Sequence, residues 1–382
     1  MVYYLRGHGQ FPEVITTATY LEERKRAIRW HLQGERPSVI CARLGRSSSW
    51  FWKWWRRYVH WGPEGLEDQS RIPHRIARRT DPDVEAAILQ LRRIKEARDR
   101  QETRYGLIGA PSIRRELHLL GFEPVPAIST IEGILQRHHL THPKVKAQDP
   151  STPREYPQPP VQNPDDLHQL DLYGPWYLKG QETKHYFYVI KDVASLAVWI
   201  DAFDTRQGQT IASFLVEAFQ TFGLPHILQM DNAMEFQGSA QHPRSLSRVI
   251  RLCLYLGVEP LFIPQKQPWC NGSVENLIGQ LEELFFQDQS FSSLQHIKEE
   301  LPRFVHCCNT QHPHAPLNYR TAQEVRKEAP VRRLCKDFQL PDRPLAIQKG
   351  KVSFIRQIRK SGWITVLSEK FDIDPGLAGE YV

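Results

Sequence analysis

The stretch that decides the fold is Leu167–Gly174, LHQLDLYG, in which apolar and polar residues alternate up to an acidic residue, Asp171. Such alternation predicts a strand with one face in a core. Two later segments also place a carboxylate beside an expected element. Asp231 follows strand-like residues 226–230, and Glu275 opens an expected helix. Three such carboxylates suit a pair of Mg²⁺ ions, which bind oxygen ligands and assist phosphoryl transfer.

Three blocks of the sequence resemble the retroviral-integrase-type core of DDE insertion-sequence transposases. They are Asp171–Gly174 (DLYG), Asp231–Phe236 (DNAMEF) and Pro268–Asn276 (PWCNGSVEN). The similarity runs from about Leu167 to Val325 and includes the segment Asn309–Leu317 (NTQHPHAPL).

The resemblance implies an RNase H-like fold in which Asp171, Asp231 and Glu275 are the catalytic residues and metal ligands. It implies two Mg²⁺ ions, for which Mn²⁺ can substitute. It also implies 3′-end cleavage and strand transfer into target DNA by a homo-oligomer assembled on paired DNA ends.

The chain departs from the family pattern at several points. Ala233 stands where glycine is usual, and 43 residues, more than usual, separate Asp231 from Glu275. Gly279 and Glu282 stand where the family commonly has a basic DNA contact. None of these departures removes an expected metal ligand. By position alone Asp192 is the rival carboxylate, and we expect it to cap a strand end or to be solvated.

The predicted fold class is multidomain, because 382 residues leave room for several domains. We expect all-α helix-turn-helix modules, an α/β RNase H-like core with a mixed five-stranded sheet, and a small β-barrel. The predicted boundaries are 1–79 for a DNA-binding module with a basic linker, 80–142 for a second module, 143–164 for a proline-rich linker, 165–330 for the core and 340–382 for the barrel.

The net positive charge lies in the N-terminal part of the chain. Residues 1–150 hold 26 Lys and Arg against 17 Asp and Glu, whereas the remainder holds 24 against 26. A basic region of this kind suits double-stranded DNA, because neutralised phosphates release counterions. A solvated basic surface is the alternative.

Three helices are expected over residues 21–33, 38–44 and 50–60, and the turn at Gly45 predicts a helix-turn-helix. Its last helix carries the expected DNA contacts Lys53, Arg56 and Arg57. We expect at least two of its tryptophans to pack in the core. Helices over residues 84–98, 112–119 and 129–137 predict the second module.

Further DNA contacts are predicted in the basic linker, in the second module and in the barrel. The linker either follows a DNA groove or is merely solvated. In the barrel, strands are expected over residues 352–358, 362–366 and 371–373, and either the last strand is short or the barrel is incomplete. The contacts are Arg75, Arg78, Arg79, Arg114, Arg115, Lys351 and Arg356.

The sequence lacks the marks of secretion, of a membrane span and of a zinc module. It has no signal-like apolar start and no apolar run of membrane-spanning length. Its six cysteines show no zinc spacing. We therefore expect a cytoplasmic, bacterial nucleoid-associated protein with no membrane partner.

Two other functions compete with that of a transposase. One is a non-catalytic DNA-binding regulator derived from such an enzyme, which the loss of an acidic residue would favour. The other is a structure-selective nuclease with the same core, which has little use for paired helix-turn-helix modules.

Overall fold

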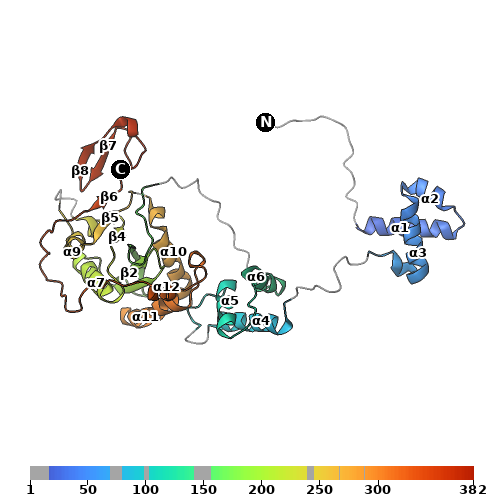
Figure 1. Cartoon of the computed structure of the whole chain (residues 1–382), viewed down its shortest axis with the longest axis horizontal. Coiled ribbons are helices and arrows are strands. Elements are labelled where there is room, and N and C mark those ends of the chain that lie inside the picture. The colour runs from blue at the N-terminus through green and yellow to red at the C-terminus, as the bar shows by residue number, and fades with distance from the viewer. Residues whose placement is uncertain are drawn as a thin grey trace. The chain divides into compact units, whose positions relative to one another are not determined.

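The computed structural model describes residues 17–68, 80–98, 103–141, 156–238, 245–265, 267–287 and 289–382 (Figure 1). The chain divides into two compact units, residues 1–79 and 80–382. No helix among the described residues is both long and apolar enough to cross a membrane.

The first unit is a small helical domain. Pro37 occupies the first turn of its second helix, and Gly45, with φ 64°, ends that helix in the left-handed conformation. Ser47 caps the third helix by accepting a hydrogen bond from the Trp50 N–H. This confirms the expected helix-turn-helix. Its elements are α1 (Thr17–Leu32), α2 (Pro37–Leu44), α3 (Ser48–Trp61) and the 3-10 turn η1 (Gly62–Leu66).

Tryptophans of α3 form part of the core of this unit, as expected. Trp54 is 4% exposed, and Trp50 and Trp55 pack against the same buried residues. Trp52, by contrast, is 43% exposed.

The second unit begins with three more helices, α4 (Pro82–Ala97), α5 (Ala110–Leu119) and α6 (Ile128–Arg137). Ile88, Ile113 and Ile131 are fully buried among them. Tyr105, in the connection before α5, is buried with Phe285 and Phe304 of the α/β core. These helices are therefore attached to the core through packed side chains.

The α/β core is built on a mixed sheet of strand order β3-β2-β1-β4-β5-β6. β1, β2 and β3 are antiparallel, whereas β4, β5 and β6 extend the sheet in parallel from β1. Three antiparallel strands followed by two parallel ones are the RNase H-like arrangement. The strands are β1 (Leu167–Tyr177), β2 (Lys184–Asp192), β3 (Val198–Phe203), β4 (Ile227–Met230), β5 (Glu259–Phe262) and β6 (Ser353–Phe354).

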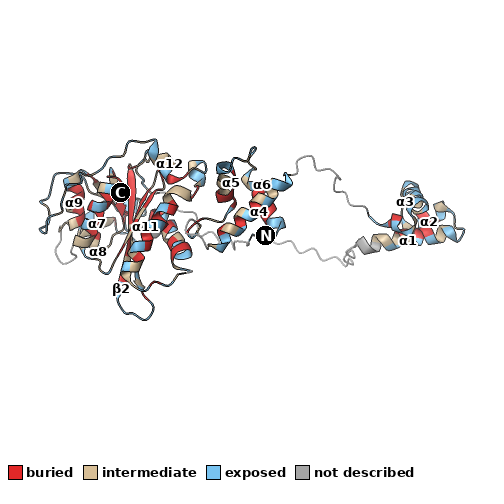
Figure 2. Cartoon of the chain, turned by 90° about the horizontal axis from the view of Figure 1, so that it is seen from below, coloured by how far each residue is buried: buried red, intermediate tan, exposed pale blue. Residues whose placement is uncertain are grey.

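Helices cover both faces of this sheet (Figure 1), whose strands are largely buried (Figure 2). Leu170 and Leu228 pack with α7 and α9 on one face. Phe187 and Val189 pack with α10 and α11 on the other. The helices are α7 (Gly208–Thr221), α8 (Met234–Gln237), α9 (Arg248–Leu256), η2 (Pro268–Asn271), α10 (Gly272–Gln280), η3 (Leu281–Phe286), α11 (Leu294–Gln311), η4 (Ala315–Leu317) and α12 (Ala322–Lys327).

The helix expected to continue from Glu275 to residue 287 changes character at residue 281. α10 is α-helical, and the following segment η3 is a π-helix. Within η3, Leu281 and Phe285 are fully buried, and Phe286 stacks on Trp176 of β1 with ring centroids 4.7 Å apart. The wider turn fits these large rings against the sheet.

The expected C-terminal barrel is not confirmed, and the sheet has six strands instead of five. β6 pairs with β5, and Phe354 stacks on Phe262 with ring centroids 4.7 Å apart. Beyond it lie β7 (Trp363–Val366) and β8 (Glu369–Asp372), a separate two-stranded sheet, and the turn η5 (Pro375–Leu377). The chain end also pairs with the segment after β6, through the isolated antiparallel bridge of Gln357 and Tyr381.

Candidate active site

Asp171 lies on β1 on the face of the sheet that α10 covers. Side chains alternate along a strand, and Leu170 and Leu172 point into the core under α7 and α9. Gln169, Asp171 and Tyr173 therefore point the other way. The Asp171 carboxylate accepts a hydrogen bond from the Leu172 N–H at 2.8 Å, which leaves most of its acceptor capacity unused.

Asp231 directly follows β4, the parallel neighbour of β1. Gln169 of β1 is paired in register with Gln229 of β4. Each glutamine stands two residues before its aspartate, so Asp231 leaves β4 beside the part of β1 that carries Asp171. The Asp231 carboxylate accepts a hydrogen bond from the Ala233 N–H at 2.9 Å, so the Asp231-Asn232-Ala233 turn forms without the glycine usual in the family.

Glu275 lies in the first turn of α10, and hydrogen bonds fix that turn to the sheet. The side-chain oxygen of Gln169 accepts from the Val274 N–H at 3.1 Å. Gln229 donates from Nε2 to the Cys270 carbonyl at 3.0 Å. Lys191 of β2 donates to the Ser273 carbonyl at 2.9 Å. Three strands therefore determine where Glu275 stands.

These supporting residues were not identified from the sequence. Gln169 is 6% exposed, Gln229 3% and Lys191 6%. A signal was present, because Gln169 and Gln229 each stand two residues before an expected catalytic aspartate, on the same strand face. Buried polar side chains require hydrogen-bond partners, and here the partners belong to the segment that carries Glu275.

Electrostatics show that Asp171 lies within the influence of the other two carboxylates. Burial raises the pKa of Asp171 to about 6, and the negative charges of Asp231 and Glu275 add to that rise. Burial also raises the pKa of Asp231, where nearby Glu235 adds to the rise and Arg206 opposes it. Among the described residues, no Lys, Arg or His forms an ion pair with any of the three.

This arrangement fits divalent metal ions. Three acidic side chains face one region, and their mutual repulsion lacks a compensating ion pair from the described part of the chain. Their oxygens do not all lie within 4.8 Å of one another. Two ions about 3.5–4 Å apart would bind ligands spread over such a span. The carboxylates are also the ligand type that Mg²⁺ prefers.

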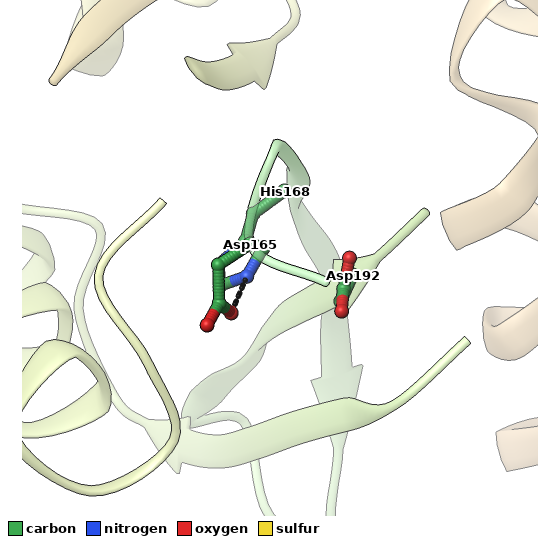
Figure 3. A group of neighbouring side chains, drawn as sticks. All are labelled: Asp165, His168 and Asp192. Atoms are coloured by element: carbon green, nitrogen blue, oxygen red, sulfur yellow. Dashed lines mark hydrogen bonds and ion pairs between the residues drawn. The ribbon is translucent and has the colours of Figure 1, made fainter. Parts of the chain in front are cut away.

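A second acidic group has a different environment. Asp165, His168 and Asp192 place ligand-type atoms within 4.8 Å of one another (Figure 3). However, Arg326 donates to Asp165 and to Asp192, at 2.9 Å in each case. His168 contacts Asp165 at 2.9 Å, and Ser195 donates to Asp192. A guanidinium already neutralises this group, so we interpret it as a structural ion-pair network.

The helix after Glu275 has no basic residue at the positions where the family commonly has one. Glu282 instead accepts a hydrogen bond from the Tyr173 hydroxyl at 2.8 Å. Tyr173 stands two residues after Asp171 on the same strand face. The contact therefore joins the strand of Asp171 to the segment that continues the helix of Glu275.

The expected DNA-contacting residues of α3 differ in their exposure to solvent. Lys53 and Arg56 are exposed. Arg57 is half-buried, donates to the Glu67 carbonyl at 2.8 Å and lies over the Trp54 ring at 4.7 Å. Arg56 also donates to the Trp52 carbonyl at 3.3 Å, and Lys53 lies over the Trp54 ring at 5.0 Å, so the three residues differ in exposure and not in having protein contacts.

The other expected DNA contacts are placed as follows. Arg114 is half-buried on α5. Arg115 makes two hydrogen bonds to Glu324, at 3.1 and 2.8 Å. Lys351 is exposed and pairs with Glu259 at 2.9 Å. Arg356 is 4% exposed and donates to backbone carbonyls, including that of Ile263, so its position suits a structural role. Arg75, Arg78 and Arg79 lie outside the described residues.

A cavity of about 780 Å³ lies away from the three carboxylates. Residues of β3, α7, α11 and α12 line it, among them Trp199, Phe222 and Leu301. The cavity contains none of the expected metal ligands. The candidate site is instead the acidic region formed by β1, the turn after β4 and the first turn of α10.

Two segments match known families. Residues 256–321 match the model of an integrase core domain, a span that contains Glu275. Residues 24–86 match the model of a winged helix-turn-helix, a span that contains α2 and α3.

Several solved structures are similar to this chain. One is the HTLV-2 integrase catalytic core domain in complex with magnesium, with 17% identity, 43% of this chain and 97% of that chain covered, and a TM-score of 0.34. The catalytic core of BIV integrase has 18% identity, 43% and 95% coverage and a TM-score of 0.33. A simian T-cell lymphotropic virus intasome bound to PP2A regulatory subunit B56 gamma has 14% identity, 62% and 74% coverage and a TM-score of 0.37.

The fold assignment rests on the strand order of the sheet, and the two family models add the sequence match. The matches support a transposase- or integrase-type DNA-binding function. The resemblance that the sequence predicted is confirmed: this chain combines an integrase-type core with a helix-turn-helix region, consistent with a DDE transposase or integrase.

Proposed function

We propose that this protein is a DDE-type transposase that binds the terminal repeats of its element and catalyses metal-dependent 3′-end cleavage and strand transfer. The observation that carries the proposal is the grouping of Asp171, Asp231 and Glu275. Asp171 lies on β1 and Asp231 directly follows the neighbouring strand β4. Burial raises the pKa of Asp171, and the negative charges of Asp231 and Glu275 add to that rise.

In this proposal Asp171, Asp231 and Glu275 hold two Mg²⁺ ions, and Mn²⁺ substitutes for Mg²⁺. When bound, such ions neutralise phosphate charge and stabilise the attacking and leaving oxygens of a phosphoryl transfer. The reaction first hydrolyses the terminal phosphodiester to free a 3′-hydroxyl. That hydroxyl then attacks a target phosphodiester directly, so that a new ester bond forms as the bond to the target strand's 3′-oxygen breaks and that oxygen leaves, with no covalent protein intermediate.

The protein's own contribution is to hold the carboxylates in place before substrate arrives. The β1–β4 register fixes Asp171 against Asp231, and the hydrogen bonds of Gln169 and Gln229 fix the turn that carries Glu275. Preorganised ligands of this kind need no rearrangement during the reaction.

Duplex DNA is the proposed partner of the helical modules. Lys53 and Arg56 are exposed on α3, the second helix of the helix-turn-helix, whose counterpart in such motifs enters the major groove. Two DNA ends must be brought together for transposition, so we propose a homo-oligomer on paired ends.

A strand-transfer assay tests the proposal. The full chain is incubated with a pre-cut duplex ending in the element's terminal repeat, a supercoiled target plasmid and Mg²⁺ or Mn²⁺, beside the variant Asp171→Asn. Metal-dependent joined product that is absent in the variant is the expected result. Binding of the duplex without joining, with metal present, would favour the regulator. Cleavage without joining would favour the nuclease.

A further inference from the structure

The proposed catalytic site is rich in acidic side chains, yet its proposed substrate, DNA, is itself negatively charged. Asp171, Asp231 and Glu275 are accompanied by Glu235 in α8. The helical segment 272–286 contains no lysine or arginine. Metal ions offset part of this negative charge, but phosphates on either side of the reacting one also need cationic partners.

Arg206 supplies a cation at this site. It lies in the loop between β3 and α7, after Phe203, and β3 runs in the same direction as β1 because both are antiparallel to β2. The loop therefore leaves the sheet at the edge where Asp231 follows β4. Gly208, at the start of α7, lies against the backbone of Glu235, 3.9 Å from its ideal Cβ position to the Glu235 carbonyl oxygen.

The contacts of Arg206 leave part of its guanidinium unused. One terminal nitrogen pairs with Glu235 at 3.0 Å, and the guanidinium lies 5.6 Å from the centre of the Tyr186 ring. Its Nε is buried and has no hydrogen-bond partner in the described part of the chain, so a phosphate would be bound by the terminal nitrogens. The side chain is 38% exposed and that of Glu235 26%, so DNA can reach the pair.

On the basis of the proposed function, we infer that Arg206 is a phosphate-binding residue of the catalytic site. In the DNA-free protein Glu235 pairs with it. When DNA enters, the guanidinium donates to a backbone phosphate beside the reacting one. Arginine suits this role because its planar fork of donors matches two phosphate oxygens at once.

The pair has little value as a structural bond. A half-exposed ion pair contributes little to stability, and Arg206 is not inside a network such as that of Arg326. Its position also compensates for the missing basic residue after Glu275, where Gly279 and Glu282 stand. The loop after β3 thus supplies the cation that the helix of Glu275 lacks.

The test compares Arg206→Gln with Glu235→Gln, because both break the same ion pair. Binding of the full chain to a short duplex of arbitrary sequence is measured without divalent metal between about 50 and 200 mM salt. We expect Arg206→Gln to weaken binding and to reduce the slope of log affinity against log salt by about 0.9. Glu235→Gln releases the guanidinium, so it should bind at least as tightly as the original chain.

Strand transfer supplies the second readout, with thermal unfolding as the control for folding. Arg206→Gln should lower joined product about ten-fold, as expected for one lost charged contact, and Arg206→Lys should recover part of it. The inference is overturned if Glu235→Gln weakens DNA binding as much as Arg206→Gln, or if Arg206→Gln matches the original chain. If the original chain yields no metal-dependent product, the proposed function fails, whereas the metal-free binding comparison still decides the role of Arg206.

Discussion

The two acidic groups of the core give one prediction that separates a structural site from a catalytic one. The same change, aspartate to asparagine, is made at Asp192 and at Asp171. The structure predicts effects of opposite sign on the free energy of unfolding, because Asp192 is neutralised by Arg326, whereas Asp171 faces other carboxylates.

In Asp192→Asn a neutral amide replaces a fully buried carboxylate, so its hydrogen-bond partners lose a negative charge. The Asp192 carboxylate is 0% exposed and accepts hydrogen bonds from Arg326 at 2.9 Å, from the Ala194 N–H at 3.2 Å and from Ser195. A buried ion pair that loses one member costs roughly 3–5 kcal/mol. Since Asp165 still pairs with Arg326, we expect a smaller loss of about 2–3 kcal/mol.

At Asp171 the amide removes an unfavourable charge. Burial, with the charges of Asp231 and Glu275, raises the pKa of Asp171 from its ordinary value of 3.8 to about 6. A carboxyl group with a raised folded-state pKa stabilises the fold below about pH 4 and loses that contribution as the pH rises through 6. At pH 7 the difference corresponds to roughly 3 kcal/mol, so metal-free Asp171→Asn should be the more stable protein by up to this amount.

Urea unfolding followed by circular dichroism at pH 7 in a chelator measures both effects. The gain in Asp171→Asn should vanish near pH 4. Mn²⁺ should stabilise the original chain and Asp192→Asn but not Asp171→Asn, because the metal relieves the same repulsion that the amide removes. A loss of stability in Asp171→Asn, or a metal response that depends on Asp192 instead, would refute this reasoning.

Four further predictions follow from single contacts. Asp231→Asn should abolish joined product in the strand-transfer assay yet leave binding of the terminal-repeat duplex nearly intact in a gel-shift assay; lost binding would contradict its assignment as a metal ligand. Gln229→Leu removes one of two hydrogen bonds to the Cys270 carbonyl, which still accepts from the Tyr156 hydroxyl; the loss should cost about 0.5–1.5 kcal/mol in urea unfolding and raise the Mn²⁺ concentration needed for joining. Arg56→Ala should lower the salt slope of duplex binding by about 1 in fluorescence anisotropy, and an unchanged slope would exclude a phosphate contact. Burial raises the pKa of Glu324, but hydrogen bonds from Arg115 and Thr321 and the charge of Arg115 together outweigh that effect and lower the pKa from 4.5 to about 2. The stabilisation by this pair is therefore present above pH 4.5 and lost as the pH falls through 2. Arg115→Gln should accordingly lower the unfolding temperature at pH 7 but not near pH 2, and an equal effect at both would contradict the linkage.

Much of the core could be predicted from the sequence because its elements carry local signals. The alternation from Leu167 marks β1, and Gly45 and Gly257 mark the ends of α2 and α9 in the left-handed conformation. The C-terminal barrel is not confirmed, and one strand expected for it belongs to the main sheet. Strand-forming residues show that a segment can pair but not which edge it joins, and Ser353–Phe354 joins β5.

In the candidate site, too, the sequence predicts the residue types but not which of them meet in space. Asp171, Asp231 and Glu275 could be proposed from their blocks, but nothing in those blocks distinguishes an acid that binds metal from one held by an arginine. Asp192 also stands at a strand end, and only the folded chain brings Arg326 to it. Arg206 was likewise not identified, since the loop that carries it is close to Asp231 only in space.

The sequence by itself determined the types and order of the chemical groups: an alternating strand ending at a carboxylate, two further acidic blocks, and basic helices before them. The tertiary structure decided which charges meet. It brought Asp231 beside the part of β1 that carries Asp171, anchored the turn of Glu275 through Gln169 and Gln229, and neutralised Asp192 with Arg326. The physical reason is that a carboxylate's role depends on its burial and on the charges beside it, and those neighbours come from residues far apart in the chain.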